Sequence, residues 1–152
     1  MANFKKRSQT NRIVVHCSAT KPSMDIGVRQ IRQWHLAQGW LDVGYHYIIR
    51  RDGTVETGRP VDTIGSHVRN HNADSVGICL VGGVPEDNPK GYEANFTNEQ
   101  MTALADLLEQ LQATYPGATI CGHHDLDSGK ACPSFNVSKW LKTGELETSS
   151  KG

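Results

Sequence analysis

The chain contains three short apolar runs of the kind that form buried strands. Residues 12–16, with the sequence RIVVH, are rich in β-branched side chains and predict a strand that ends on His16. Residues 75–81 form a second apolar run, which Gly82-Gly83 closes, and they predict a central strand. Residues 118–121 predict the last strand of the sheet.

A hairpin is predicted between the first two of these strands. Residues 45–50 and 54–57 flank the dipeptide Asp52-Gly53. This dipeptide supplies the positive φ angles that a tight turn between antiparallel strands requires.

Three segments have the apolar spacing of helices. Residues 28–38 place Val28, Ile31, Trp34 and His35 on one face, and Gly39 follows as a stop signal. A longer helix begins after Thr97, whose capping box with Gln100 precedes a series of leucines, and it ends at Pro116-Gly117. A short closing helix is predicted over residues 137–141. Strands separated by helices predict an α/β fold with a single mixed central β-sheet flanked by helices.

Length and composition are those of one globular domain. The chain has 152 residues, of which 37% are hydrophobic and 21% charged. We expect a flexible N-terminal arm over residues 1–11, a folded domain over residues 12–142 and a polar C-terminal tail over residues 143–152. We also expect the protein to be a monomer.

Charge and hydropathy argue against two classes of partner. Lys and Arg total 16, as do Asp and Glu, so no strong positive field is available for direct binding of nucleic acid. The N-terminal segment MANFKKRSQTN is basic but is followed by no apolar signal region, and no apolar stretch is long enough to span a bilayer. We therefore expect no membrane insertion, and a chain that stays in the cytoplasm in which it is made.

The four cysteines occur singly, which argues against a disulfide framework in a chain of this kind. Cys17 and Cys79 are expected to pack in the core. Cys121 is expected to be a small buried hydrophobe rather than a metal ligand. Cys132 is the remaining cysteine.

His16, His123 and Cys132 are expected at the ends of strands on one edge of the sheet, where ligands collect in α/β folds. Two imidazoles and one thiolate with an open fourth position are typical of catalytic zinc, whereas a structural site normally has four protein ligands. Spacing alone leaves a second interpretation open, in which these histidines are ordinary core or surface residues.

Six segments of the chain, taken in order, resemble the N-acetylmuramoyl-L-alanine amidase family, which includes the peptidoglycan recognition proteins. Within that family the chain is similar to the phage endolysins of short-tailed coliphages, and the resemblance extends from Phe4 to about Ser149. The segments are HCSATKPS, RQIRQWHLAQGWLDVGYHYIIRRDGTVETGR, GSH, VGICLVGG, ANFT and HHDLDSGKACPSF.

This resemblance implies an enzyme that binds one Zn²⁺ ion and hydrolyses the amide between N-acetylmuramic acid and L-alanine of peptidoglycan. It implies that His16, His123 and Cys132 bind the zinc ion and that Tyr45 and Lys130 act in catalysis. Through the GSH segment it also suggests that His67 lines the substrate groove.

The roles of the two catalytic candidates remain open at this point. The chain has no HExxH helix to supply a glutamate base, so Tyr45 or a deprotonated Lys130 would accept the proton of the attacking water. A charged Lys130 would instead stabilise the developing oxyanion.

The resemblance leaves three functions to compare. The first is an endolysin that lyses the host, waiting in the host cytoplasm until the membrane is permeabilised. The second is a peptidoglycan-binding protein without catalysis, a kind that lacks the cysteine ligand in this family. The third, compatible with the first, is an inhibitor of the phage RNA polymerase.

Overall fold

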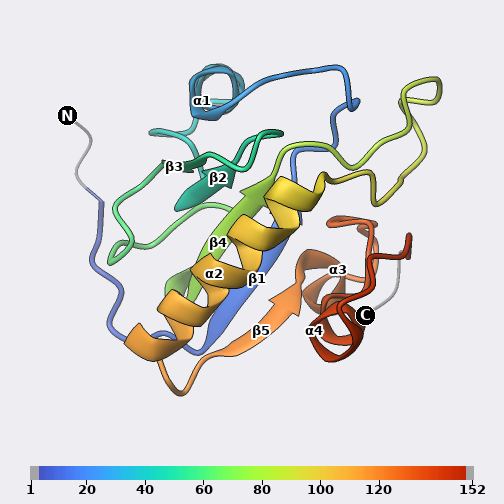
Figure 1. Ribbon diagram of the computed structural model, residues 1–152. Helices are drawn as coiled ribbons and strands as arrows, with labels where there is room; N and C mark the ends of the chain where they lie inside the picture. Colours follow the sequence, from blue (N-terminus) through green and yellow to red (C-terminus); the bar gives the residue numbers. More distant parts are fainter. Residues whose placement is uncertain (1–3, 150–152) are drawn as a thin grey trace.

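A computed structural model of the protein describes residues 4–149 and contains one five-stranded mixed sheet (Figure 1). The strand order is β3-β2-β4-β1-β5, with β3 antiparallel to β2 and the other neighbours parallel. This confirms the predicted α/β class with a single mixed sheet. The strands are β1 (Arg12–Cys17), β2 (Tyr47–Ile49), β3 (Val55–Thr57), β4 (Ser75–Leu80) and β5 (Thr119–Gly122).

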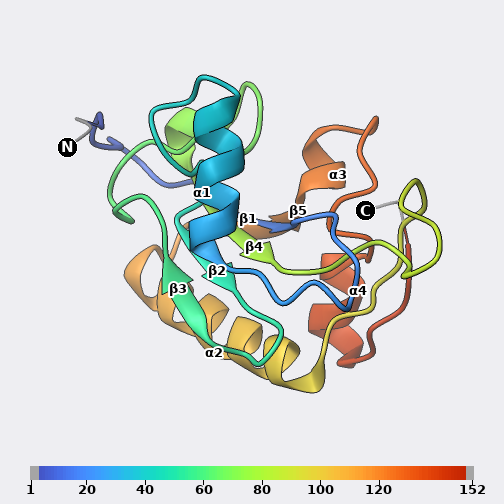
Figure 2. The ribbon, with the colours of Figure 1, turned by 90° about the horizontal axis from the view of Figure 1, so that it is seen from above.

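Helices cover both faces of this sheet. Figure 2 shows α1 (Val28–Ala37) over one face and α2 (Asn98–Thr114) over the other, while α3 (His123–Leu126) and α4 (Val137–Thr143) lie beyond β5. A single 3-10 turn, η1 (Asn72–Asp74), leads into β4. Among the described residues, no helix is long and apolar enough to cross a membrane.

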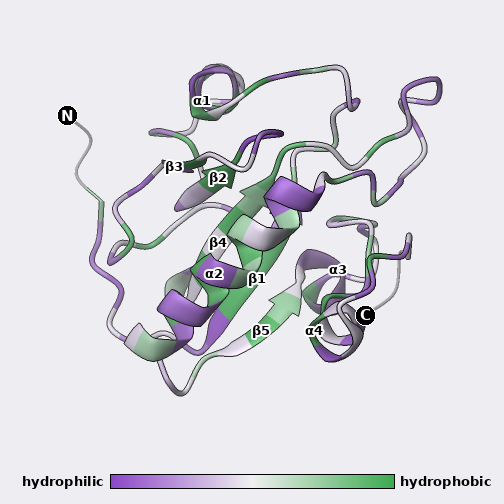
Figure 3. Ribbon diagram, viewed as in Figure 1, coloured by the Kyte–Doolittle hydropathy of each residue, from purple (hydrophilic) through white to green (hydrophobic). Residues whose placement is uncertain are grey.

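The two central strands are apolar on both faces because each face meets a helix layer (Figure 3). On β4, Val76 and Ile78 join the core beneath α2, whereas Cys79 joins the smaller core beneath α1. On β1, Ile13, Val15 and Cys17 face the α2 side. Because side chains alternate along a strand, His16 projects from the opposite face, on which α1 lies.

The capping box predicted for the long helix is present. Thr97 Oγ1 accepts from the backbone N–H of Gln100, and Gln100 Oε1 accepts from the N–H of Thr97. The fully buried Gln100 amide also donates to the carbonyls of Ile49, the last residue of β2, and Val81, which follows β4. The helix start is thereby bonded to the carboxyl edge of the sheet.

Element boundaries differ from the sequence expectation in two places near the site. The strand expected over residues 45–50 is limited to Tyr47–Ile49, because Tyr45 and His46 bond through their carbonyls to Arg59 and Gly58 outside the regular ladder. The sequence pattern predicts no helix in the segment directly after β5. This segment forms the short helix α3, whose first turn is closed by Asp125 accepting from the N–H of Gly122.

Both terminal segments lie against the domain over their described parts. Lys6 pairs with Thr63 in an isolated antiparallel bridge, and the N–H of Arg7 donates to the carbonyl of Asp62. The described part of the predicted arm thus contacts the domain, while residues 1–3 of the arm lie outside the described residues. Near the other end, Thr148 pairs with Phe135 in a similar bridge, so the predicted polar tail also packs on the fold up to residue 149.

Candidate metal centre

The fold brings His16, His123 and Cys132 together from three separate segments. His16 is the fifth residue of β1, His123 begins α3 directly after the parallel strand β5, and Cys132 lies in the loop between α3 and α4. One donor atom from each of the three lies within 4.8 Å of the other two. Within residues 4–149 they are the one such group of histidine, cysteine or carboxylate donors.

The spacing of these donors fits a small tetrahedral ion. The Nδ1 atoms of His16 and His123 face each other at 3.2 Å. Two nitrogen ligands of tetrahedral zinc, each bound at about 2.0–2.1 Å, lie roughly 3.3–3.4 Å apart. The donor set of two imidazoles and one thiol, with no fourth protein donor in the group, is that of a catalytic rather than a structural zinc site.

Burial shifts the pKa values of two of the donors away from their ordinary values. Burial raises the pKa of the Cys132 thiol well above its ordinary value, and the adjacent Cys17 raises it further. Burial likewise lowers the pKa of His16 well below its ordinary value, so this imidazole is neutral. Neutral imidazoles are the form that binds a metal, and a metal cation would stabilise the Cys132 thiolate.

The other three cysteines do not belong to the donor group. Cys17 packs in the core on the α2 side, and its backbone N–H lies 3.1 Å from Cys132 Sγ. Cys79 is fully buried in the second core. Cys121 is half-buried rather than buried and does not belong to the donor group.

Tyr45 lies against the metal-centre histidine, with ring centroids of Tyr45 and His16 5.1 Å apart. Burial raises the pKa of the Tyr45 hydroxyl well above its ordinary value, and the nearby cysteines Cys79, Cys132 and Cys17 add to this. Tyr45 therefore carries its proton at neutral pH in the protein without metal, and it is suited to donate a hydrogen bond beside the cluster.

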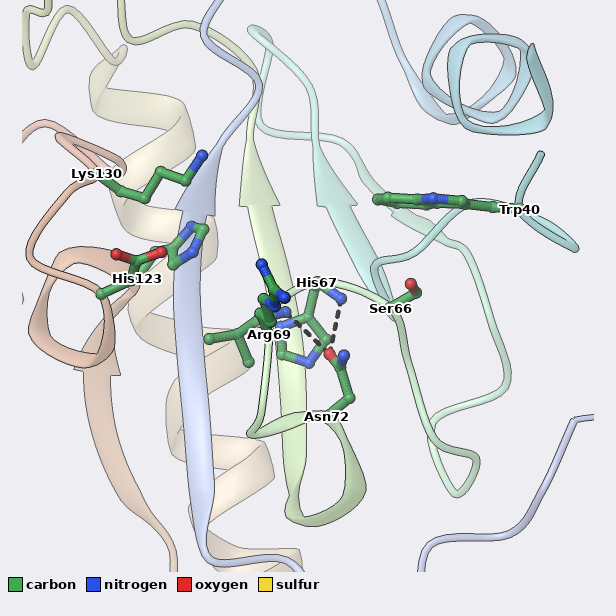
Figure 4. Close-up of a pocket in the computed structure, with 9 residues that line it drawn as sticks. Trp40, Ser66, His67, Arg69, Asn72, His123 and Lys130 are labelled. Carbon is green, nitrogen blue, oxygen red and sulfur yellow. Dashed lines mark hydrogen bonds between the residues drawn. The ribbon is translucent and has the colours of Figure 1, made fainter. Parts of the chain in front are cut away.

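A groove of about 410 Å³ borders the donor group at His123 (Figure 4). His123 and Lys130 lie on one side of it and Trp40 on the other, with His67 and Arg69 between them. Lys130 is exposed, and its backbone N–H bonds to the carbonyl of Asp127, which also lines the groove. The long Lys130 side chain is thus available to a ligand lying over His123.

His67, suggested by the sequence as a substrate-groove residue, contributes to the groove lining but is only 8% exposed. Its ring nitrogens face protein atoms: Nδ1 lies 2.8 Å from His16 Nε2 and Nε2 lies 3.1 Å from Ser75 Oγ. Sequence reasoning assigned no role to Ser75, because a serine at the start of an apolar strand has no distinguishing signal.

Two tryptophans in and just after α1 are not fully buried against the sheet. Trp34 on α1 is 41% exposed. Trp40 stacks on His35, with ring centroids 4.3 Å apart, and lines the groove. Trp40 therefore offers an aromatic surface to a ligand in the groove.

His46 gives the fold a dependence on pH. Its Nδ1 accepts from the N–H of Gly77 and its Nε2 lies 2.8 Å from the carbonyl of Thr63. Burial lowers the pKa of His46 to about 4, and Arg7 and Arg59 also lower it.

Because the unfolded chain binds a proton at His46 near pH 6.5 and the folded chain does so only near pH 4, folding is weakened as the pH falls through this window. The contribution of neutral His46 to the free energy of unfolding is therefore present in full above about pH 6.5. We expect the stability difference between wild type and His46→Gln, measured by urea unfolding, to shrink by about 2 to 3 kcal/mol from pH 7 to pH 4.5. An unchanged difference would show that His46 is not held neutral in the fold.

The chain is similar to known proteins over nearly its whole length. A family profile described as N-acetylmuramoyl-L-alanine amidase matches residues 6–135. The endolysin of Enterobacteria phage K11 is 61% identical over 150 residues, which cover 98% of this chain and 97% of that protein. The endolysin of Escherichia phage T7 is 54% identical over 149 residues, covering 98% and 97%.

The fold is similar to that of a solved endolysin, the N-acetylmuramoyl-L-alanine amidase LysCS from Clostridium intestinale, with a TM-score of 0.78 and 29% identity. The match covers 94% of this chain and 88% of that one. The bumblebee peptidoglycan recognition protein SA has the same fold at 21% identity, with a TM-score of 0.73, 99% of this chain and 90% of that chain covered. By the extent of these matches and the profile over residues 6–135, the chain belongs to the N-acetylmuramoyl-L-alanine amidase family.

Proposed function

We propose that this protein is a zinc-dependent endolysin that hydrolyses the amide between N-acetylmuramic acid and L-alanine in peptidoglycan. The observation that carries the proposal is the group of His16, His123 and Cys132 donors, whose member His123 lines a groove together with Lys130. The membership of the amidase family and the similarity to phage endolysins support the bond and the substrate.

His16, His123 and Cys132 would hold the ion through two nitrogens and one sulfur. A zinc ion with three such ligands acts as a Lewis acid that polarises an amide carbonyl and acidifies water. The burial of His16 and the packing of Cys132 against the backbone of Cys17 hold two of these donors in place before any ion arrives. A preformed donor set reduces the ordering that binding requires.

Lys130 and Tyr45 are the two side chains proposed to act on the substrate beside the ion. Lys130 is exposed in the groove next to His123, where its ammonium can stabilise negative charge on the carbonyl oxygen of the substrate. Tyr45 is half-buried beside His16, and its protonated hydroxyl can orient the attacking water or the lactyl group. The aromatic face of Trp40 across the groove is suited to contact a sugar ring or the peptide stem.

The proposal is tested by incubating the protein with purified peptidoglycan and analysing the products. We expect new L-alanine N-termini without new reducing sugar ends. Treatment with a chelator should abolish the release of L-alanine N-termini, and adding Zn²⁺ should restore it. New reducing ends would identify a glycosidase instead. If the metal-free protein still formed the product, the proposed dependence on zinc would be wrong.

Peptidoglycan binding without hydrolysis is the alternative, and it predicts that the same incubation retains the protein on the cell wall but yields no new ends. Host lysis from the cytoplasm after membrane permeabilisation, and inhibition of the phage RNA polymerase, stay predictions. A transcription assay with the cognate polymerase tests the second of these, since no inhibition at micromolar protein would exclude it.

A further inference from the structure

A continuous chain of hydrogen bonds leads away from the metal centre into the interior. His16 Nε2 lies 2.8 Å from His67 Nδ1, and His67 Nε2 lies 3.1 Å from Ser75 Oγ. Ser75 Oγ in turn donates to the backbone carbonyl of His71 at 2.7 Å. All three side chains are buried, with exposures of 1% for His16, 8% for His67 and 0% for Ser75.

The hydrogen bond from Ser75 to the carbonyl of His71 determines which atom is the donor in each of the other hydrogen bonds of this series. A serine hydroxyl has a single proton, and that of Ser75 is donated to the carbonyl of His71. Ser75 Oγ must therefore accept from His67, so that His67 carries its ring proton on Nε2 and has a lone pair on Nδ1. That lone pair accepts from Nε2–H of His16, which leaves Nδ1 of His16 unprotonated.

The unprotonated nitrogen is the one that faces the metal centre. Nδ1 of His16 is the atom that lies 3.2 Å from Nδ1 of His123. An imidazole binds a metal through its unprotonated nitrogen, and the hydrogen bond made by its other nitrogen determines which one that is. If His67 had its proton on Nδ1, His16 would be driven to the opposite tautomer, with an N–H pointing at the ion.

The surrounding backbone holds the His67 ring in this position. A Cβ atom at Gly77 of β4 would lie 2.5 Å from His67 Cγ, and one at Gly65 would lie 2.8 Å from His67 Cδ2. The ring therefore occupies space that any side chain at these positions would fill. The backbone N–H groups of His67 and Val68 both donate to Asn72 Oδ1, which fixes the segment that bears the ring (Figure 4).

We propose that His67 and Ser75 are positioning residues that fix the tautomer of His16, so that its Nδ1 lone pair is presented to the metal ion. This inference rests on the proposed zinc function and gives His67 a role other than that of a substrate contact. Such residues behind a metal-binding histidine typically change metal affinity by about 10- to 100-fold.

The first test is the zinc affinity of purified variants, measured by competition with a chromophoric chelator. We expect His67→Leu to bind Zn²⁺ about 10- to 100-fold more weakly than wild type, and Ser75→Ala to be weakened in the same direction. His67→Asn, whose amide oxygen can replace the Nδ1 acceptor, should recover part of the loss. Wild-type zinc affinity in both His67→Leu and Ser75→Ala would overturn the proposal.

A matched control separates this effect from a general loss of stability. Val76 follows Ser75 on β4, is fully buried, and packs on the opposite face beneath α2. Val76→Ala should lower the stability of the protein and leave its zinc affinity within about threefold of wild type. If Val76→Ala weakened zinc binding as much as His67→Leu, the positioning role would be wrong.

The second test reads the tautomers directly and needs no variant. Two-bond ¹H–¹⁵N correlation spectra of the wild-type protein, with and without Zn²⁺, should show the ring protons of His16 and His67 on Nε2. A ring proton on Nδ1 of either residue would contradict the proposal. Absence of zinc binding or of amide cleavage by wild type would refute the proposed function, whereas the spectrum of the metal-free protein would still decide this inference.

Discussion

Replacing Cys132 by serine is expected to lower the rate of amide hydrolysis by roughly 10³-fold or more, because the loss of the thiolate removes a ligand of an ion that contributes several kcal/mol to catalysis. Cys132 is the only sulfur in the donor group of the described chain, and a serine hydroxyl does not ionise to a comparable ligand. Zinc affinity should fall together with the rate.

The groove should keep its shape in this variant, since Lys130 and Trp40 do not depend on the thiol for their positions. Cys132→Ser is therefore expected to sediment with peptidoglycan while releasing no L-alanine N-termini. Cys121→Ser is the matched control, because Cys121 lies outside the donor group and should keep the wild-type rate. A Cys132→Ser protein with wild-type rate and zinc affinity would exclude Cys132 as a ligand.

The course of the strands and the long helix was predictable because each depends on local pattern. The β-branched run of β1 and the capping box at Thr97 have their own physical causes within a few residues, and the structure contains both. The predicted hairpin was also found, although β2 is shorter than residues 45–50. Its boundary depends on Arg59 and Gly58, which no pattern in the strand itself reveals.

The donor group was predictable in its members but not in its geometry. The alternation of side chains along β1 explains why His16 and not Cys17 faces the site, and this could be inferred from the sequence. The contact of His67 with His16 depends on the absence of a side chain at Gly77, about ten residues further along the chain and on another element. Such a contact has no local signature, so the sequence suggested only a groove residue at position 67.

The exposure of Trp34 and the position of Trp40 also have no local signature in the sequence. A helical period predicts which residues share a face of α1, but not how far that face extends under the next layer. Ile31 and His35 are buried, whereas Trp34 lies at the margin and is exposed. Trp40 follows the helix and owes its place in the groove to its stacking on His35.

Lys130→Ala is expected to lower the rate of hydrolysis by about 10²- to 10³-fold while leaving zinc affinity and stability close to wild type. The side chain is exposed and projects into the groove beside His123, so its removal should disturb neither the core nor the donor group. The measurement is the initial rate of release of L-alanine N-termini at saturating peptidoglycan, together with the zinc affinity. Lys142→Ala, on exposed α4, controls for the loss of one positive charge.

A further variant separates the two roles that the sequence left open for Lys130. Lys130→Arg keeps a permanent positive charge but cannot act as a base, since the guanidinium does not lose its proton in proteins. If Lys130 stabilises the oxyanion, Lys130→Arg should recover at least tenfold of the rate lost in Lys130→Ala, about 1.4 kcal/mol of transition-state stabilisation. If a neutral Lys130 is the base, Lys130→Arg should be as slow as Lys130→Ala. A full wild-type rate in Lys130→Ala would exclude both roles and leave Tyr45, which lies against His16, as the remaining catalytic side chain of the two.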